Sequence, residues 1–337
     1  MERSSSADFR ENFYTRCHLC GRECGADRTR GEAGFCGEGA TLRIAWAGLH
    51  YGEEPVICGA GGSGAVFLSG CTLRCFFCQN HELSGGGGPG RDVSLYEFTE
   101  ICLMLQEKGA ENINIVTGTH FIPSLAAGIS AARERGLRLP VVWNSSGFER
   151  EALLEVLDSF TDIYLPDIKT LDSRLGRALF GVSGYAQAAA RAVLAMAASR
   201  PLRYADDSSG RLVSGLIVRH LVLPGLMENT REVLTWFAEN LAGRALLSLM
   251  FQFTPPRRPL PCGEGADSRH KIPGDWDRRV SSGEYAEVLS FLEELGIEEG
   301  FVQELPDTDE LPDFSRADAF PPALARPLWF YGGPENA

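Results

Sequence analysis

The sequence predicts an α/β protein of parallel strands that curl into a partial or full barrel, the alternative being an open doubly wound sheet. Short apolar segments typical of strands alternate with longer segments of helical periodicity, about six times over. Repeated strand–helix units imply parallel strands, because each helix returns the chain to the same end of the sheet. Polar or cysteine-containing segments follow several of these strands, which is where the working groups of such barrels lie.

The individual elements follow from apolar periodicity and from turn residues. The predicted strands are 65–68, 112–116, 140–143, 163–168, 216–223, 245–253 and 300–305. The predicted helices are 94–108, 123–135, 149–159, 173–180, 184–199, 229–240 and 283–295. A further strand at 42–48 is expected to lead into the main domain.

Some boundaries carry specific signals. Ser94 with Glu97 three residues later predicts a capping box at the start of a helix. Gly109 and Gly136 are expected to end two helices, and Asn229 is expected to cap another. A proline inside the 163–168 strand, Pro166, indicates a local bulge.

Composition limits the class of protein. The chain has 337 residues and a net charge of −13, which argues against a broad basic face for nucleic acid. No apolar run approaches the roughly 18 residues needed to cross a bilayer, and residues 1–15 lack an apolar signal-peptide core. We therefore expect a cytoplasmic protein without a membrane partner. Its ten cysteines then indicate metal or redox chemistry rather than disulfides.

The segment 69–80 holds three cysteines, Cys71, Cys75 and Cys78, directly after the first barrel strand. Thiolates hold iron–sulfur clusters, and a four-iron cluster normally takes four of them. Three ligands would leave one iron open, as a catalytic metal site keeps one position free. A structural zinc site that includes His81, or thiols that are merely buried, are the alternatives.

The cysteine spacing resembles the signature of the radical S-adenosylmethionine (radical SAM) enzymes. The surrounding residues resemble the group related to pyruvate formate-lyase activating enzyme, in patches between Cys17 and Pro255. The segments that carry this likeness are Glu53-Glu54-Pro55, Gly62-Ser63-Gly64, Phe67-Leu68-Ser69-Gly70-Cys71 and Cys78-Gln79-Asn80. The resemblance implies a partial (β/α)6 TIM-like barrel with a 4Fe-4S cluster on Cys71, Cys75 and Cys78.

The resemblance also implies a reaction. A radical SAM enzyme cleaves SAM reductively, and the 5′-deoxyadenosyl radical formed abstracts hydrogen from a substrate. In an activating enzyme the substrate is a glycine of a partner protein, and the electron comes from a reductant such as flavodoxin or ferredoxin. The alternatives are a radical SAM enzyme that modifies a small molecule, peptide or RNA, and a non-catalytic iron–sulfur or zinc protein.

Candidate SAM contacts lie at the ends of the predicted strands. Asp167 and Lys169 are two residues apart on one strand and so share a face, where they form either a SAM site or a structural ion pair. Asp167-Ile168-Lys169 resembles the Asp-Leu-Lys segment of activating enzymes, whose charged members contact SAM. Strand alternation sends only one of Arg219 and His220 inward, and the resemblance favours Arg219 for the SAM carboxylate.

The remaining candidates rest on weaker likenesses. Thr117 and Gly118 stand where the family has Gly-Gly-Glu, so the carboxylate is absent here; His120, just beyond, is either a ligand contact or a structural histidine. Asn144 and Ser145 partly match a segment near SAM. Phe77 is either a surface for adenine or a packed core residue.

A second group of cysteines precedes the barrel. Cys17, Cys20, Cys24 and Cys36 lie within a Gly- and Arg-rich segment that cannot build a core unaided. Zinc or a second iron–sulfur cluster would supply the missing folding energy, the alternative being reduced, packed thiols. We expect three parts: a Cys-rich segment 1–60, a barrel 61–305 and a Pro-rich tail 306–337 that drapes over the barrel.

Overall fold

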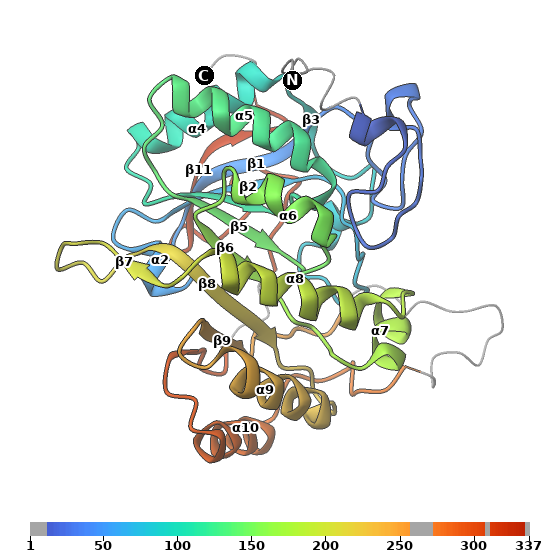
Figure 1. Cartoon of the computed structure of the whole chain (residues 1–337), viewed down its shortest axis with the longest axis vertical. Coiled ribbons are helices and arrows are strands. Elements are labelled where there is room, and N and C mark those ends of the chain that lie inside the picture. Colours follow the sequence, from blue (N-terminus) through green and yellow to red (C-terminus); the bar gives the residue numbers. More distant parts are fainter. Residues whose placement is uncertain (1–11, 257–271, 307–310, 334–337) are drawn as a thin grey trace.

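The computed structural model describes residues 12–256, 272–306 and 311–333 (Figure 1). Cys262, to which the sequence assigns no role, lies outside these residues. No helix in the described part of the chain is both long and apolar enough to cross a membrane.

One twisted sheet organises the chain. Its strands run in the order β10-β9-β8-β6-β5-β4-β2-β1-β11. Pairing is parallel from β2 to β10 and antiparallel where β1 joins β2 and β11. The strands are β1 (Arg43–His50), β2 (Ser63–Leu68), β3 (Arg91–Asp92), β4 (Ile113–Val116), β5 (Val141–Ser145), β6 (Ile163–Pro166), β7 (Arg203–Tyr204), β8 (Leu212–Leu221), β9 (Leu246–Met250), β10 (Gly300–Val302) and β11 (Ala325–Phe330). Because β10 and β11 are the unjoined ends of the path, the fold is a partial barrel, as the sequence predicts.

Helices cover the outer face of this sheet (Figure 1). They are α2 (Pro55–Cys58), α3 (His81–Ser84), α4 (Leu95–Glu107), α5 (Ile122–Glu134), α6 (Leu154–Asp158), α7 (Ser173–Phe180), α8 (Tyr185–Ser199), α9 (Met227–Leu241) and α10 (Ser282–Leu295). The short α2 and α3 are exceptions. Ile57 of α2 packs with Val142, Ile163 and Ile217 on the inner face, and Leu83 of α3 packs there with Trp46 and Phe67.

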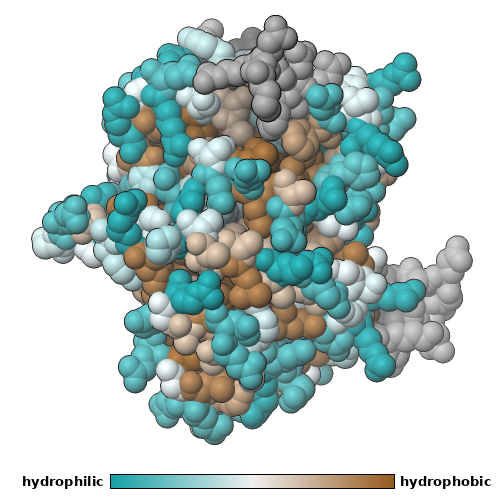
Figure 2. Space-filling model, viewed as in Figure 1, coloured by the Kyte–Doolittle hydropathy of each residue, from teal (hydrophilic) through white to brown (hydrophobic). Residues whose placement is uncertain are grey.

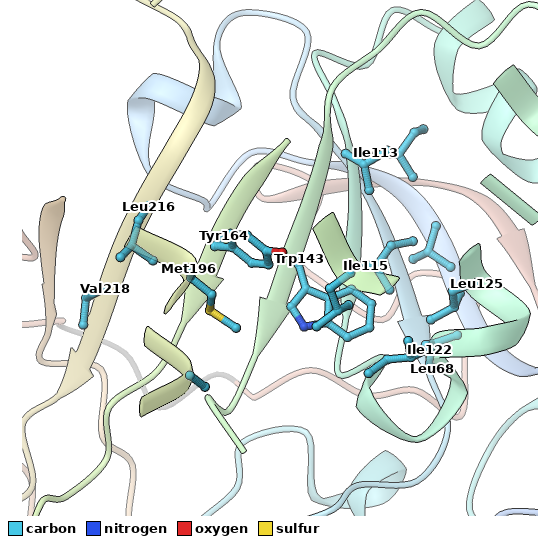
Figure 3. Packing of buried hydrophobic residues seen from close by; sticks show 14 of the residues in the cluster. Leu68, Ile113, Ile115, Ile122, Leu125, Trp143, Tyr164, Met196, Leu216 and Val218 are labelled. Atoms are coloured by element: carbon cyan, nitrogen blue, oxygen red, sulfur yellow. The ribbon is translucent and has the colours of Figure 1, made fainter. Parts of the chain in front are cut away.

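The main core lies between the sheet and the helices. Figure 3 shows Ile115 and Trp143 from the strands meeting Leu125 from α5, with Tyr164 and Met196 alongside. Alternate strand residues point the other way, so that Asn114 and Asn144 belong to the inner face. The period of two in each strand therefore separates an apolar outer face from an inner face that contains polar groups.

The helix signals are mostly confirmed. Ser94 and Glu97 form the predicted capping box at the start of α4. Asn229 is not a cap, because α9 begins at Met227 and the Asn229 side chain donates instead to the Lys169 carbonyl (3.0 Å). The helix predicted from residue 149 starts later, because Glu149 is extended and bridges to Cys20.

The strand around Pro166 contains no bulge. The bridges Ile163–Gly215 and Asp167–Arg219 keep the same register on either side of the proline. Pro166 has no N–H to donate, so the ladder is interrupted there without a shift in register.

The C-terminal tail is built into the barrel rather than only draped over it. β11 extends the sheet beside β1, and the preceding segment places Phe314 and Phe320 on the inner face. Their rings lie 5.2 and 5.5 Å from that of Phe67, and Trp46 Nε1 donates to the Ala317 carbonyl (2.8 Å).

The face of the molecule shown in Figure 2 mixes polar and apolar residues, in keeping with a core that lies inside.

We expect Phe314→Ala to lower the free energy of unfolding by about 3–5 kcal/mol, because the ring is fully buried and its loss leaves a cavity. Urea denaturation of the metal-free protein measures this. Tyr96→Ala is the control, since that ring is 65% exposed, and should cost less than about 1 kcal/mol. Equal losses for both variants would show that the tail is not part of the core.

Candidate active site

The three-cysteine loop begins where β2 ends. Gly70 has a φ of +80°, and a Cβ there would lie 2.4 Å from the Cγ of Glu38, so only glycine fits the turn. Ser69 N and Gly70 N donate to the carbonyls of Arg43 and Leu83. These bonds fix the direction in which the loop leaves the sheet.

The three thiols of the loop interact electrostatically with one another, and Cys75 also interacts with Lys169 of the inner face. Cys75 is 9% exposed, Cys71 and Cys78 are half-buried, and all three are free thiols. Arg74 between them has a φ of +54°, a strained value for a non-glycine residue. Three soft donors on one strained loop fit a cluster with three protein ligands.

Metal binding at this loop must displace protons. Burial raises the pKa of the Cys78 thiol to about 11 and raises the pKa of Cys75 as well. A soft metal lowers such values by binding the thiolate directly. In the described residues, no three or more His, Cys, Asp or Glu side chains are spaced to hold one metal ion.

Beside the loop lies a buried group of charges on the inner face. The Asp167 carboxylate accepts from Lys169 Nζ at 2.6 Å and from Arg219 Nε at 2.8 Å. The three side chains are only 14–15% exposed. The structure thus confirms that Asp167 and Lys169 share a face and that Arg219 points inward.

Two more residues complete this polar network. Arg219 Nη2 donates to Asn144 Oδ1 (2.5 Å), and Arg219 Nη1 lies 3.5 Å from Glu53 Oε2. Glu53 also accepts from Asn114 Nδ2 (3.1 Å). In the sequence, Glu53 stands out only as part of a segment that resembles the family. It lies before Pro55, away from any predicted strand end, so nothing else in the sequence indicates its role.

The protonation of this network follows from its contacts. Burial alone would raise the pKa of Asp167, but the guanidinium of Arg219 and the ammonium of Lys169 outweigh it and lower that pKa. For Glu53, burial raises the pKa and Arg219 only partly offsets it. Asp167 is therefore the firmly ionised carboxylate between two cations.

The segment after β4 is strained where the sequence predicts a SAM contact. Thr117 has a φ of +62°, which is unusual for a β-branched residue. A Cβ on Gly118 would lie 2.6 Å from the Trp143 ring, so glycine is required. The neighbouring Thr119 donates to Glu149 Oε1 (2.7 Å), which puts a buried carboxylate beside the place where the family's glutamate is missing.

Glu149 is a residue that the sequence analysis missed. It is 1% exposed, and its Oε2 has no hydrogen-bond partner among the described residues. Burial raises its pKa. Glu149 follows β5 after only a short loop, and the sequence predicts it as the first residue of a helix. Its proximity to Thr119 arises only from the tertiary fold.

Two other candidates, Phe77 and Ser145, lie outside the charged network. The Phe77 ring is 5% exposed and stacks on Trp276 at 5.6 Å, so it is packed in a cluster of aromatic rings. The Ser145 hydroxyl accepts from Gly147 N (3.2 Å) and lies off the network. A narrow recess beside the loop is lined by Phe76, Phe77, Cys78, Gln79, His81, Thr254, Pro256 and Leu311.

The two candidate histidines are structural in their contacts. His120 Nε2 meets the Ser69 carbonyl at 2.7 Å, directly before the cysteine loop. His220 Nδ1 meets the Ile168 carbonyl (2.7 Å) and its Nε2 meets Thr230 Oγ1 (3.1 Å). Both rings are buried behind the network rather than in it.

Comparisons with known proteins agree with this geometry. The model of the "Radical SAM superfamily" matches residues 66–232, which include the cysteine loop, Asp167, Lys169 and Arg219. The uncharacterized protein MJ0674 of Methanocaldococcus jannaschii is 25% identical over 297 residues, covering 86% of this chain and 77% of its own.

Solved structures with a similar arrangement are more distant in sequence. Streptococcus suis SuiB bound to the precursor peptide SuiA is 13% identical with a TM-score of 0.46, and the match covers 69% of this chain and 46% of SuiB. Methylornithine synthase (PylB) is 14% identical with a TM-score of 0.41, and the match covers 72% of this chain and 71% of PylB. A domain of a pyruvate-formate lyase-activating enzyme from Bacteroides vulgatus is 11% identical with a TM-score of 0.35, covering 54% of this chain and 91% of the domain.

The chain belongs to the radical SAM superfamily. Membership marks it as an enzyme of SAM-dependent radical chemistry, and the family implies a 4Fe-4S cluster. The three-thiol loop described above has the donor set that such a cluster requires.

The buried His220 makes stability depend on pH. Burial lowers its pKa to about 4, so below the usual value near 6.5 only the unfolded chain takes up a proton. Stability present above pH 6.5 is therefore lost as the pH falls toward 4. We expect His220→Gln to make this loss shallower by up to about 1.4 kcal/mol per pH unit.

Urea denaturation of the metal-free protein between pH 7 and pH 5 measures the slope. Wild type and variant are compared at each pH, so that any constant cost of the substitution cancels. An unchanged slope would mean that this imidazole is protonated in the folded protein.

Proposed function

We propose that this protein cleaves SAM reductively at a 4Fe-4S cluster held by Cys71, Cys75 and Cys78 and uses the radical to abstract hydrogen from a substrate. The observation that supports it is the juxtaposition of the three thiols with the buried Asp167–Lys169–Arg219 group. When bound, the reduced cluster supplies the electron that splits SAM into methionine and a 5′-deoxyadenosyl radical. The chain's own residues bind SAM, orient it and keep water out.

The charge balance of the network favours an anionic group of the ligand. Two fixed cations, Lys169 and Arg219, face one firmly ionised carboxylate, Asp167. Glu53 and Glu54 also act electrostatically on Arg219. Burial raises the pKa of both, so each is a weaker counter-charge than Asp167. The methionine carboxylate of SAM would complete this balance, with Arg219 and Lys169 as its donors.

The positive end of SAM needs acceptors in the same region. Asn144 Oδ1 lies within the network, and the half-buried Thr117 lies next to Asn144, since Thr117 N donates to the Asn144 carbonyl (2.8 Å). We assign these two residues and Gly118 to the SAM amino group and ribose. The assignment of Ser145 and of an adenine surface at Phe77 stays a prediction.

The substrate we propose is a glycine of a partner protein, which would make this an activating-enzyme-like oxidoreductase supplied with electrons by flavodoxin or ferredoxin. The support is the resemblance of residues around the cysteine loop to the group related to pyruvate formate-lyase activating enzyme. A radical SAM enzyme that acts on a small molecule, peptide or RNA shares the cluster and differs only in what enters the barrel.

The central test is anaerobic incubation of the reconstituted protein with SAM and a strong reductant. We expect 5′-deoxyadenosine and methionine in equal amounts, and no product above background with Cys75→Ala. If wild-type protein with an intact cluster forms no 5′-deoxyadenosine, the protein is a metal-binding barrel and not a radical enzyme. Electron paramagnetic resonance of a mixture with a candidate partner then tests for a glycyl radical.

Lys169→Ala tests the SAM site separately from the cluster. We expect the dissociation constant for SAM to rise at least about tenfold, since a charge-assisted contact is worth about 1.5–3 kcal/mol, while the visible absorbance of the cluster is retained. Lys108→Ala is the matched control, because that lysine is exposed at the end of α4. Equal SAM affinity in the two variants would remove Lys169 from the site.

A further inference from the structure

We propose that Cys17, Cys20, Cys24 and Cys36 hold a second metal centre, bound by four thiolates and joined to the first through Arg22. The proposal concerns residues outside the segment that matches the superfamily and does not depend on the SAM reaction. Four thiolates suit zinc or an iron–sulfur cluster, and the experiment below distinguishes these two.

The backbone folds so that the four cysteines lie on neighbouring turns, although no three thiols of the described residues are spaced to hold one metal ion. Cys17 and the segment after Cys24 are paired, since Cys17 N donates to the Ala26 carbonyl (3.0 Å) and Gly25 N to the Cys17 carbonyl (2.9 Å). A tight turn follows Cys20, whose carbonyl accepts from Glu23 N (3.0 Å). These bonds bring three of the cysteines, which are seven residues apart at most, onto one small loop.

The fourth cysteine meets this loop at Gly34. A Cβ on Gly34 would lie 3.0 Å from Cys24 Sγ and 3.6 Å from Cys36 Sγ, so both sulfurs approach the same point. Cys20 in turn interacts electrostatically with the thiols of Cys17, Cys24 and Cys36. All four are free thiols, and three of them are buried although the segment has little apolar core of its own.

The arginines around the four thiols favour an anionic group at this place. Arg28 is 2% exposed; its Nη1 lies 3.9 Å from Cys17 Sγ, and its other hydrogen bonds go to the carbonyls of Gly39 and His120. Among the described residues, no carboxylate lies within 4.0 Å of the Arg22 or Arg28 guanidinium to form an ion pair, and the buried Glu38 carboxylate acts on Arg28 only without such a pair. A buried cation needs a counter-charge. Four thiolates on a divalent ion or a cluster carry net negative charge, whereas four protonated thiols carry none.

Arg22 connects this group to the first cysteine loop. Its Nε donates to the Thr72 carbonyl (2.8 Å) and its Nη2 to the carbonyls of Leu73 (3.4 Å) and Phe180 (2.5 Å). The same guanidinium interacts electrostatically with Cys20, Cys71 and Cys75. The segment is also docked on the barrel, because Gly21 N donates to the Phe148 carbonyl (3.2 Å). A metal at the four thiols would therefore fix the residue that holds the backbone of the SAM-cleaving loop.

The test measures metal in variants of the whole chain after anaerobic reconstitution with iron, sulfide and zinc. The variant Cys71→Ala/Cys75→Ala/Cys78→Ala should lose SAM cleavage and about four irons per chain but keep a second pool. That pool is about one zinc, or about four irons with sulfide and a visible charge-transfer band. Cys17→Ser/Cys20→Ser should lose this pool alone, while Cys58→Ser/Cys102→Ser, which changes two buried thiols elsewhere, should match wild type.

Thiol alkylation of the wild-type protein, read by mass spectrometry, gives a measurement that needs no variant to fold. Cys24 is the exposed thiol of the four and should be protected in the metal-loaded protein and reactive after chelation. Two results together would overturn the proposal. One is a triple variant that holds no more zinc or iron than a chain lacking all seven cysteines, and the other is Cys24 reactivity that does not change on metal loading. Because the triple variant lacks the first cluster by design, failure of the proposed SAM reaction would leave this outcome unaffected.

Discussion

The site depends on one shared carboxylate. Inside the barrel, the Asp167 carboxylate accepts hydrogen bonds from Lys169 Nζ at 2.6 Å and from Arg219 Nε at 2.8 Å. Each cation would be costly to bury alone, so the position of one side chain fixes the other two. Arg219 then extends the arrangement across the inner face to Asn144 and toward Glu53. A single anion at the end of β6 thereby sets the geometry of residues from β5, β8 and the loop before α2.

Much of the fold is visible in the sequence because it repeats. Each parallel strand is a short apolar run followed by a helix, so local periodicity was enough to find β2, β4, β5, β6, β8, β9 and β10. β11 was not predicted because it contains Pro327, which disfavours a strand. It pairs antiparallel with β1, and local sequence patterns do not reveal a partner strand so far away in the chain. The position of Asn229 was misjudged for a related reason: its side chain serves a tertiary contact with Lys169 rather than the helix end.

The residues of the candidate site divide in the same way into those that local sequence identifies and those that it does not. Cysteine spacing was sufficient to single out Cys71, Cys75 and Cys78. Strand alternation showed that only one of Arg219 and His220 points inward, and the family resemblance was needed to choose Arg219. Glu53 and Glu149 were not predicted as site residues, since their importance arises only when distant segments meet. Glu149 reaches Thr119 (2.7 Å) across the gap between β4 and β5, and the carboxylate that a family comparison finds missing after β4 is thus present nearby from another part of the chain.

The aromatic tail on the inner face has a consequence for what can reach the cysteine loop. Phe314 and Phe320 pack against Phe67 and Trp46, so the concavity beside β1 and β2 is filled by the protein itself. Ile57 of α2 likewise packs on Val142, Ile163 and Ile217, so side chains also fill part of the inner face beside β5, β6 and β8. The protein's own side chains thus occupy space on the inner face that a reactant would otherwise use on its way to the cysteine loop.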